Sequence, residues 1–296
     1  MVVFERGALE LKGNLHMHTT MSDGRKAPLD AIADYEAAGY DFLAITDHRR
    51  VTRVPEYQGR VVLVPGVEMD VEPSELEVIH LVGVGVGEGF TRGFQTGLSA
   101  QEYIDLARAH GGVCVLAHPH WSMMREATVL ALRGLAGAEV FNSVSGPPYS
   151  PERRDSTHLL DLAAARGMLL PTVAADDTHF YGAELAKSWT VVQAERRDAA
   201  AVADALRAGR FYASQGPRFK RVTWDGDTVA VECEPVSRVL FHSDLTWAHG
   251  RVHEGEGLTH ASYRPERDRG ESFIRVILED GQGRRAWLNP FSLVEA

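Results

Sequence analysis

The stretch Asn14-Leu15-His16-Met17-His18-Thr19-Thr20-Met21-Ser22-Asp23-Gly24 decides how the rest of the chain is interpreted. In an extended segment alternate side chains point the same way, so His16 and His18 can present two imidazoles to one metal ion. Leu15 and Met17 then face the opposite side. A single His-x-His pair is more often chance or a surface pair, so the interpretation depends on whether similar groups recur.

They do recur, because five further segments place an imidazole or a carboxylate within, just after or at the end of a short apolar run. These segments are Thr46-Asp47-His48, Gly66-Val67-Glu68, Ile79-His80-Leu81, Ala117-His118-Pro119 and Asp176-Asp177-Thr178-His179. The pattern predicts that the ligands converge on one site.

Composition places the chain among soluble proteins with a sizeable core, since 44% of its 296 residues are hydrophobic. Its two cysteines, Cys114 and Cys233, provide no disulfide framework and no thiolate metal site. The first residues do not resemble a signal peptide, and no apolar run approaches the roughly 20 residues that span a bilayer. We therefore expect a cytoplasmic protein without membrane partners. A formal charge of -10 argues against nonspecific nucleic-acid binding.

Apolar runs alternate with helical patterns over about the first 215 residues. Strands are expected at 12–15, 42–45, 61–64, 78–84, 113–116, 138–141, 168–173 and 189–192, and helices at 28–39, 99–110, 156–166 and 198–209. The helix at 99–110 begins with a capping-box pattern, Ser99-Ala100-Gln101-Glu102. This alternation predicts an α/β fold with a parallel sheet that is closed or nearly closed into a barrel.

The pattern changes after about residue 219, where glycine and proline separate short β-like runs at 229–231, 238–241 and 273–278. We expect two domains: residues 1–218 as the α/β domain and residues 219–296 as a small all-β, sandwich-like domain.

The expected ligands, imidazoles and carboxylates without sulfur, suit zinc, manganese or iron. Five or more histidines and several carboxylates exceed the needs of one ion, so we expect two or three divalent ions, with Glu68 as a bridge. Clustered cations make hydroxide available near neutral pH and polarise a phosphoryl or acyl oxygen, which favours hydrolysis through a metal-bridging hydroxide.

The ordered motifs resemble those of the polymerase and histidinol phosphatase (PHP) superfamily. The resemblance is carried by His16-x-His18, Ser22-Asp23-Gly24, Thr46-Asp47-His48, Gly66-Val67-Glu68, His80, His118-Pro119 and Asp177-x-His179. It implies a distorted (βα)7 TIM-like barrel and a metal-dependent phosphoesterase. Asp23, where other members have histidine, is similar to the branch acting on nucleotide or sugar phosphates. The C-terminal part resembles members with an appended β domain, some of which hydrolyse carboxylic or carbamate esters.

Carried over residue by residue, the resemblance implies three groups of ligands. They are His16, His18, Glu68 and Asp177; then Glu68, His80 and His118; then Asp23, His48 and His179. The family's Asp-x-His spacing selects Asp177 rather than its neighbour Asp176, which can instead be a partner of a ligand.

Catalytic and substrate-binding candidates are Asp47 and His120, as acids for the leaving group, and Arg25 and Arg49, as binders of phosphate. Each has a simpler interpretation. Asp47 can orient an imidazole or cap a turn, His120 can be solvated, and each arginine can be an ordinary surface charge.

Three functions follow as hypotheses. The first is hydrolysis of a small-molecule phosphate ester of the nucleotide or sugar-phosphate type, with nucleic acid relevant only as a nucleotide or short oligonucleotide substrate. The second is metal-dependent hydrolysis of carboxylic or carbamate esters. The third is a non-catalytic accessory module stabilised by metal. The residues do not identify the metal, and they leave the oligomeric state open.

Overall fold

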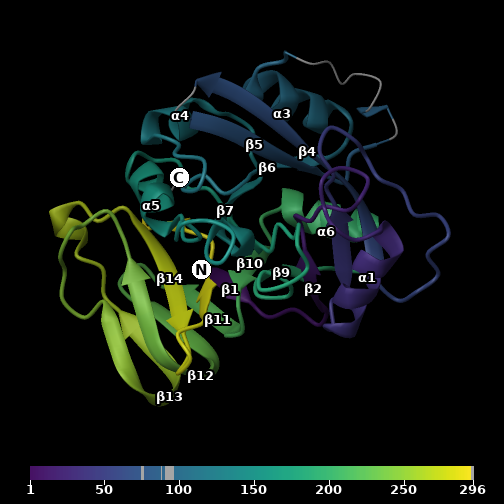
Figure 1. Ribbon diagram of the computed structural model, residues 1–296. Coiled ribbons are helices and arrows are strands. Elements are labelled where there is room, and N and C mark those ends of the chain that lie inside the picture. The colour runs from purple at the N-terminus through teal and green to yellow at the C-terminus, as the bar shows by residue number, and fades with distance from the viewer. Residues whose placement is uncertain (75–76, 88, 91–96, 295–296) are drawn as a thin grey trace.

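Short apolar runs form the parallel strands of a mixed α/β fold in the computed structural model, which describes residues 1–74, 77–87, 89–90 and 97–294 (Figure 1). One parallel set contains β2 (Glu10–Asn14), β3 (Phe42–Ile45) and β4 (Val62–Ser74), and the other contains β6 (Val113–Leu116), β7 (Gly137–Asn142) and β8 (Thr172–Ala175). Every residue of β3, β6 and β8 is buried, as expected for strands covered on both faces.

An antiparallel hairpin, with no helix between its strands, joins the two parallel sets. β5 (Glu77–Val84) pairs antiparallel with both β4 and β6. On the other side of β2, β9 (Trp189–Gln193) lies antiparallel to β2, and β10 (Phe211–Ser214) lies antiparallel to β9. The regular alternation of strand and helix that the sequence predicted is therefore broken at both places.

The expected (βα)7 TIM-like barrel is not confirmed, because the sheet is open. Its sixteen described strands form one continuous sheet, and backbone pairing ends at β8 without returning to β9 or β10. A side chain spans part of this gap. The Thr190 hydroxyl of β9 accepts a hydrogen bond from the Ala174 amide of β8 at 3.3 Å and donates to the Ala174 carbonyl at 3.1 Å.

The helices begin at local signals in the sequence. The four predicted helices are confirmed as α1 (Pro28–Ala37), α3 (Ala100–Ala109), α5 (Thr157–Ala165) and α6 (Ala199–Arg207), and the structure adds the short α4 (Glu126–Ala131). Ser99 and Glu102 form the complete capping box at the start of α3. Asp198 caps α6 by accepting a hydrogen bond from the Ala201 amide at 2.7 Å.

Antiparallel strands make up the C-terminal part, seen as the green and yellow lobe in Figure 1. They are β11 (Phe219–Trp224), β12 (Val229–His242), β13 (Val252–Tyr263), β14 (Phe273–Glu279), β15 (Arg285–Trp287) and β16 (Phe291–Ser292). The runs at 229–231 and 238–241 belong to one long strand, β12. This lobe has its own apolar core, which includes Phe219, Phe241 and Val276.

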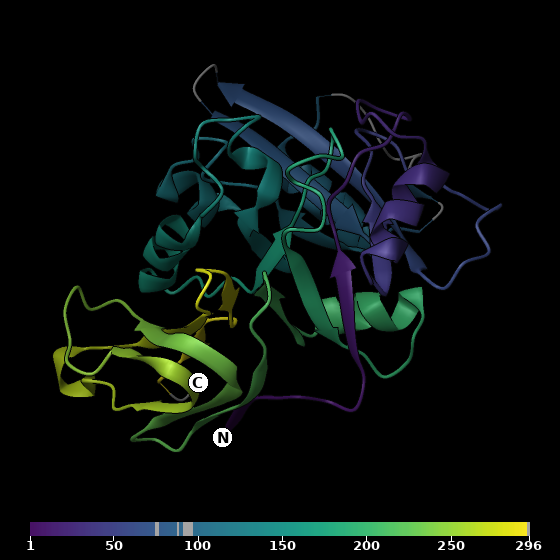
Figure 2. The same cartoon turned by 60° about the horizontal axis from the view of Figure 1, so that its bottom comes forward.

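The two parts of the molecule share strands. β1 (Val2–Glu5) pairs with β11, so the N-terminus lies against the C-terminal lobe (Figure 2). β15 pairs with β14 on one side and with β10 on the other. A boundary between residues 218 and 219 therefore divides the sequence without dividing the hydrogen-bonded sheet, and the C-terminal lobe continues that sheet instead of standing apart as a sandwich.

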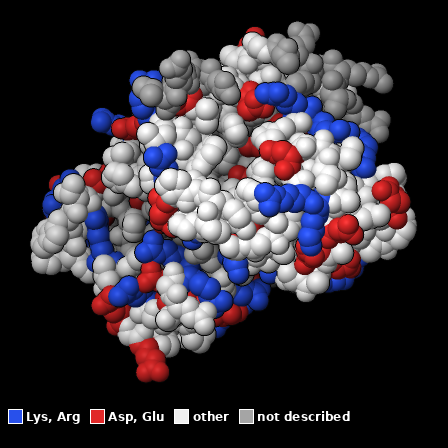
Figure 3. All heavy atoms as spheres, viewed as in Figure 1, with Lys and Arg blue, Asp and Glu red and all other residues white. Residues whose placement is uncertain are grey.

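Lysine and arginine side chains are interspersed with acidic ones on the face shown in Figure 3. Among the described residues, no helix has both the length and the apolar composition needed to cross a bilayer.

Candidate metal centre

Most of the expected ligands follow directly after a parallel strand, so the sheet brings them to one edge. His16 and His18 follow β2, His48 follows β3, His118 follows β6, and Asp177 and His179 follow β8. Glu68 and His80 differ from this pattern. β4 continues through Glu68 instead of ending before it, and His80 lies inside β5. The hairpin of these two strands therefore supplies one wall of the site.

The histidine pair at the end of β2 alternates as the sequence predicted. His16 and His18 are fully buried and face the site. Leu15 and Met17 are also buried but pack in two apolar clusters away from it. The amide of His18 donates a hydrogen bond to the Thr178 carbonyl at 2.9 Å, which holds this segment beside the loop that follows β8.

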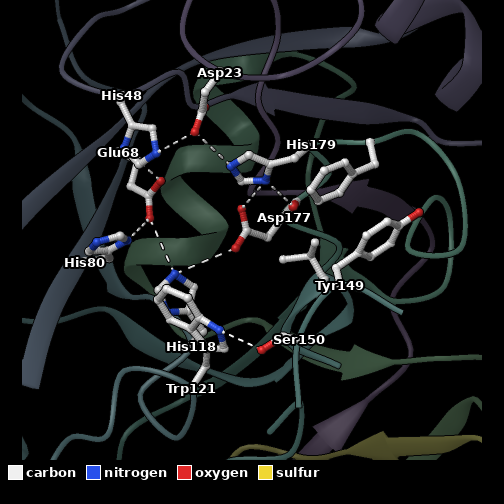
Figure 4. A pocket seen from close by; sticks show the side chains of 12 residues that line it. Asp23, His48, Glu68, His80, His118, Trp121, Tyr149, Ser150, Asp177 and His179 are labelled. Atoms are coloured by element: carbon white, nitrogen blue, oxygen red, sulfur yellow. Dashed lines mark hydrogen bonds and ion pairs between the residues drawn. The ribbon is translucent and has the colours of Figure 1, made fainter. Parts of the chain in front are cut away.

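Three overlapping groups place possible ligand atoms within 4.8 Å of one another. They are His16, His18, Glu68 and Asp177; Glu68, His80 and His118; and His18, Asp23, His48 and His179. Figure 4 shows the members that line the pocket, which do not include His16 and His18. These groups coincide with those implied by the resemblance, except that His18 also belongs to the third.

Glu68 lies where the first two groups meet. One of its carboxylate oxygens, Oε2, is 3.2 Å from His16 Nε2 and 3.0 Å from His18 Nε2. The other, Oε1, is 2.9 Å from His80 Nδ1 and 3.6 Å from His118 Nε2. A carboxylate with one oxygen on each side has the geometry of a bridge between two ions.

Unpaired polar atoms support a metal at this position. His16 Nε2, His18 Nε2, His48 Nδ1 and Asp177 Oδ1 are buried and lack a hydrogen-bond partner. Each such atom costs roughly 1–3 kcal/mol when it stays unsatisfied. Coordination of a cation by these lone pairs removes that cost, so the residues present fit divalent ions.

The pKa shifts within the cluster also indicate a site for cations. Burial raises the pKa of Glu68 and Asp177, but the positive charge of His16 and neighbouring histidines outweighs it and holds both values well below the usual range. Burial lowers the pKa of His179, yet Asp23 and Asp177 raise it to about 9. The carboxylates of Glu68 and Asp177 are therefore held in the ionised form that binds a divalent cation.

Two ligand residues have left-handed backbone conformations that side chains other than glycine seldom adopt. His118 has φ 24° and Asp177 has φ 52°. Such conformations cost on the order of 1–3 kcal/mol each and concentrate at functional sites. Hydrogen bonds fix both positions, since the His118 amide donates to Glu139 Oε2 at 2.8 Å and the Asp177 amide donates to the His16 carbonyl at 2.9 Å.

Glu139 is a buried carboxylate in contact with two possible ligands, and the sequence reasoning missed it. It is buried in β7, and its Oε1 lies 2.8 Å from His16 Nδ1. Its other oxygen accepts hydrogen bonds from the amide of His118 and from the side chain of Asn142 at 2.8 Å each. A carboxylate in this position fixes the tautomer and orientation of a ligating histidine. The available signal was a charged residue within the apolar run 138–141.

The neighbouring acids Asp176 and Asp177 have different partners. Asp177 faces the cluster, whereas Asp176 accepts hydrogen bonds from the Tyr35 and Ser143 hydroxyls and from the amides of residues 186–188, at 2.7–3.0 Å. Burial outweighs these donors and raises the pKa of Asp176 to about 6. Asp176 therefore anchors the loop after β8 and belongs to none of the three possible ligand groups.

Of the two catalytic candidates, Asp47 does not reach the pocket. Its fully buried carboxylate accepts hydrogen bonds from the Thr19 amide at 2.7 Å, from the Ser22 hydroxyl at 2.9 Å and from the hydroxyl of Thr52. These contacts match the interpretation of Asp47 as a turn-stabilising residue. His120 is exposed, with Nδ1 2.7 Å from the Asp155 carbonyl, and does not line the pocket.

The arginine candidates lie outside the pocket wall. The exposed Arg25 guanidinium lies 4.6 Å from the centre of the Phe180 ring, which lines the pocket. Arg49 is exposed and forms an ion pair with Asp70. Arg25 thus lies at the rim of the pocket, whereas the Arg49 guanidinium is directed to the carboxylate of Asp70.

The pocket above the cluster has a volume of about 380 Å³. Besides the ligand residues it is lined by Trp121, Val144, Tyr149, Ser150 and Phe180, several of which come from the loops after β7 and β8 (Figure 4). This volume suits a small molecule.

No family model and no curated protein matches the chain. Among solved structures, the chain is similar to a two-domain protein from Bacteroides vulgatus that contains a predicted PHP-like metal-dependent phosphoesterase. The TM-score is 0.53 at 14% identity, and the match covers 98% of this chain and 97% of that one. The similarity shows a shared fold over both parts of the molecule.

Two shorter matches cover 57% of this chain and 88% of the other. One is an amidohydrolase from Chromobacterium violaceum, solved with sulfate and no metal, with a TM-score of 0.46 at 19% identity. The other is a protein from Bifidobacterium adolescentis proposed to be a metal-dependent phosphoesterase, with a TM-score of 0.44 at 18% identity.

Proposed function

We propose that the protein is a metal-dependent hydrolase that releases phosphate from a small phosphate ester. The observation that carries this proposal is the set of three possible ligand groups, of which the first and second share Glu68 and the first and third share His18. The fold shared with the two-domain PHP-like protein supports it. The chemistry of the ligands suits two or three ions of zinc, manganese or iron.

Bound ions would supply the charge that polarises a phosphoryl oxygen and acidifies water. The chain's own residues set the geometry. Glu139 orients His16, and the hydroxyl of Ser122, 2.9 Å from His118 Nδ1, orients His118. Trp121 packs its ring edge to face with that of His118, with centres 4.8 Å apart, and so fixes the position of that imidazole from a second side.

The proposed substrate is a small molecule, and nucleotides and sugar phosphates, the classes that the resemblance implies, are included in the test. A membrane partner is not part of the proposal, and a net charge of -10 disfavours binding to long nucleic acids. Two buried, free cysteines suit the reducing cytoplasm.

The test is to measure the metal content of the purified protein and then to assay phosphate release from monoesters, nucleotides and diesters with each metal restored. We expect phosphate release that is abolished by chelation and by Glu68→Gln. The exposed Glu256→Gln substitution in β13 is the matched control. Failure to hydrolyse any member of the panel would overturn the proposal.

Two other outcomes identify the alternative functions. Chelator-sensitive hydrolysis of 4-nitrophenyl acetate that exceeds hydrolysis of 4-nitrophenyl phosphate would identify an esterase. Strong stabilisation by metal without hydrolysis of any ester would identify an accessory module.

A further inference from the structure

The pocket has two chemically different sides. One consists of the histidine and carboxylate cluster, and the other of Trp121, Val144, Tyr149 and Phe180. Figure 4 shows Trp121 and Tyr149 beside the cluster, on separate loops. An ester whose phosphate faces the cluster would place its alcohol portion against the apolar side.

Neighbouring contacts hold the aromatic rings in place. Tyr149 and Phe180 stack with their centres 4.2 Å apart and their planes 6° from parallel. The Tyr149 hydroxyl accepts a hydrogen bond from the Ala183 amide at 3.0 Å, and the Arg25 guanidinium lies over Phe180. Rings that are already fixed lose little conformational entropy when a ligand binds.

The polar atoms on this side are already paired. Trp121 Nε1 donates a hydrogen bond to the Ser150 hydroxyl at 3.0 Å. Among the described residues that line the pocket, none is a lysine or an arginine. A leaving group with several hydroxyls or a second phosphate would lose its hydrogen bonds to water here without replacing them. A flat apolar ring has no hydrogen bonds to water to lose, and it would gain contact with aromatic faces and edges.

We propose that the substrate is a phosphate monoester whose alcohol carries a flat, apolar ring, bound against Trp121, Tyr149 and Phe180. That the substrate is a phosphate ester rests on the proposed function. Hydrolysis adds water across the bond between phosphorus and the alcohol oxygen, so that the products are inorganic phosphate and the free alcohol.

The kinetic test compares benzyl phosphate with cyclohexylmethyl phosphate and glucose 6-phosphate on the full-length, metal-loaded protein. These esters have alcohol leaving groups, so a preference among them reports recognition more than leaving-group reactivity. We expect kcat/KM for benzyl phosphate to be about tenfold or more above the value for glucose 6-phosphate. It should be a few-fold above the value for cyclohexylmethyl phosphate.

A binding test separates recognition from catalysis. Benzylphosphonate, which cannot be hydrolysed, should bind about tenfold more tightly than methylphosphonate by calorimetry. Tyr149→Leu and Phe180→Leu should each reduce this ratio, because leucine keeps apolar volume but removes the flat ring. Trp247→Leu, at an exposed tryptophan in the C-terminal lobe, is the matched control and should leave the ratio unchanged.

The outcomes distinguish the two proposals. Phosphate release from all three esters at equal efficiency, with equal binding of both phosphonates, would overturn the inference and leave the phosphoesterase function intact. Tighter binding of benzylphosphonate without hydrolysis of any ester would support recognition of the ring and overturn the phosphoesterase function.

Discussion

At the scale of single residues, the carboxylates near the cluster divide into ligands and supports. Asp177 and Glu68 direct oxygens at several imidazoles, whereas Asp47, Glu139 and Asp176 use theirs to accept hydrogen bonds from neighbouring side chains and amides. Among the supports, Glu139 also holds the strained backbone at His118 by accepting a hydrogen bond from its amide. Two substitutions test this division.

Glu139→Gln should weaken metal binding by about 10–100-fold, the usual effect of losing a carboxylate that orients a ligating histidine. The amide can face only one of the His16 and His118 donors with its oxygen. Competition with a chromogenic chelator measures the affinity. Glu256→Gln, at an exposed carboxylate, is the control, and unchanged affinity in Glu139→Gln would contradict the orienting role.

The adjacent aspartates should respond differently. Asp177→Asn should reduce bound metal, because it removes a charged ligand. Asp176→Asn should retain metal but lower the free energy of unfolding by about 1–3 kcal/mol, because an amide cannot accept from every donor around it. Metal analysis and urea unfolding measure the two effects. Loss of metal in Asp176→Asn alone would show that the Asp-x-His spacing selected the wrong acid.

At the scale of elements, charged side chains add two contacts to the strand pairing that joins the C-terminal lobe to the rest. Asp161 on α5 accepts a hydrogen bond from the fully buried Arg275 of β14 at 2.7 Å and lies 2.8 Å from His242 of β12. Arg285 of β15 lies 3.2 Å from Asp155, whose loop also carries Tyr149. The first contact concerns stability, and the second concerns the shape of the pocket.

Asp161→Asn should destabilise the protein by about 3–5 kcal/mol, since it leaves the buried Arg275 without its counter-charge. Burial raises the pKa of Asp161, but the charges of Arg275 and His242 outweigh it and lower the value. The stabilisation is thus present above the unfolded pKa of about 4 and is lost as pH falls through the lower folded pKa.

Denaturant unfolding between pH 7 and pH 2 should show this acid loss in the wild type and a smaller one in Asp161→Asn. Asp105→Asn, at an exposed aspartate of α3, should behave as the wild type. Parallel pH profiles for all three proteins would contradict a stabilising role for Asp161.

Arg285→Met should raise KM several-fold with little change in kcat, because it loosens the loop that carries Tyr149 while the ligand cluster stays in place. The size follows from the roughly 0.2–1 kcal/mol of a partly exposed ion pair. Steady-state kinetics on the preferred ester measure it. Arg264→Met, which removes an exposed pair with Asp227 within the lobe, should change neither constant.

At the scale of the whole molecule, the cluster joins segments from both parallel sets and the hairpin between them. Removal of metal should therefore destabilise the entire fold. We expect a chelator to lower the Tm by roughly 5–15 °C, as for a ligand held well above its dissociation constant. Glu68→Gln should lose most of this response in a thermal scan, and an equal shift in both proteins would place the metal elsewhere.

The local parts of the fold could be predicted because their signals lie within a few residues. Ser99 and Glu102 indicate the start of α3, and Asp198 indicates the start of α6. The apolar run 42–45 matches β3. The pairing of β1 with β11 joins segments more than 200 residues apart, and nothing in either segment indicates the other. The antiparallel pairing of β9 with β2 joins segments about as far apart and was missed for the same reason. The antiparallel direction of β5 was missed because its apolar run was assigned to a parallel sheet.

The sequence by itself determined the ligand types, their order along the chain and most of the helices, because side-chain chemistry and local periodicity depend on neighbouring residues. Only the tertiary structure decided that the sheet stays open, that Asp47 and Asp176 support the site instead of entering it, and that aromatic rings face the cluster. Those outcomes depend on which distant segments pack together and on which donors each buried carboxylate meets there.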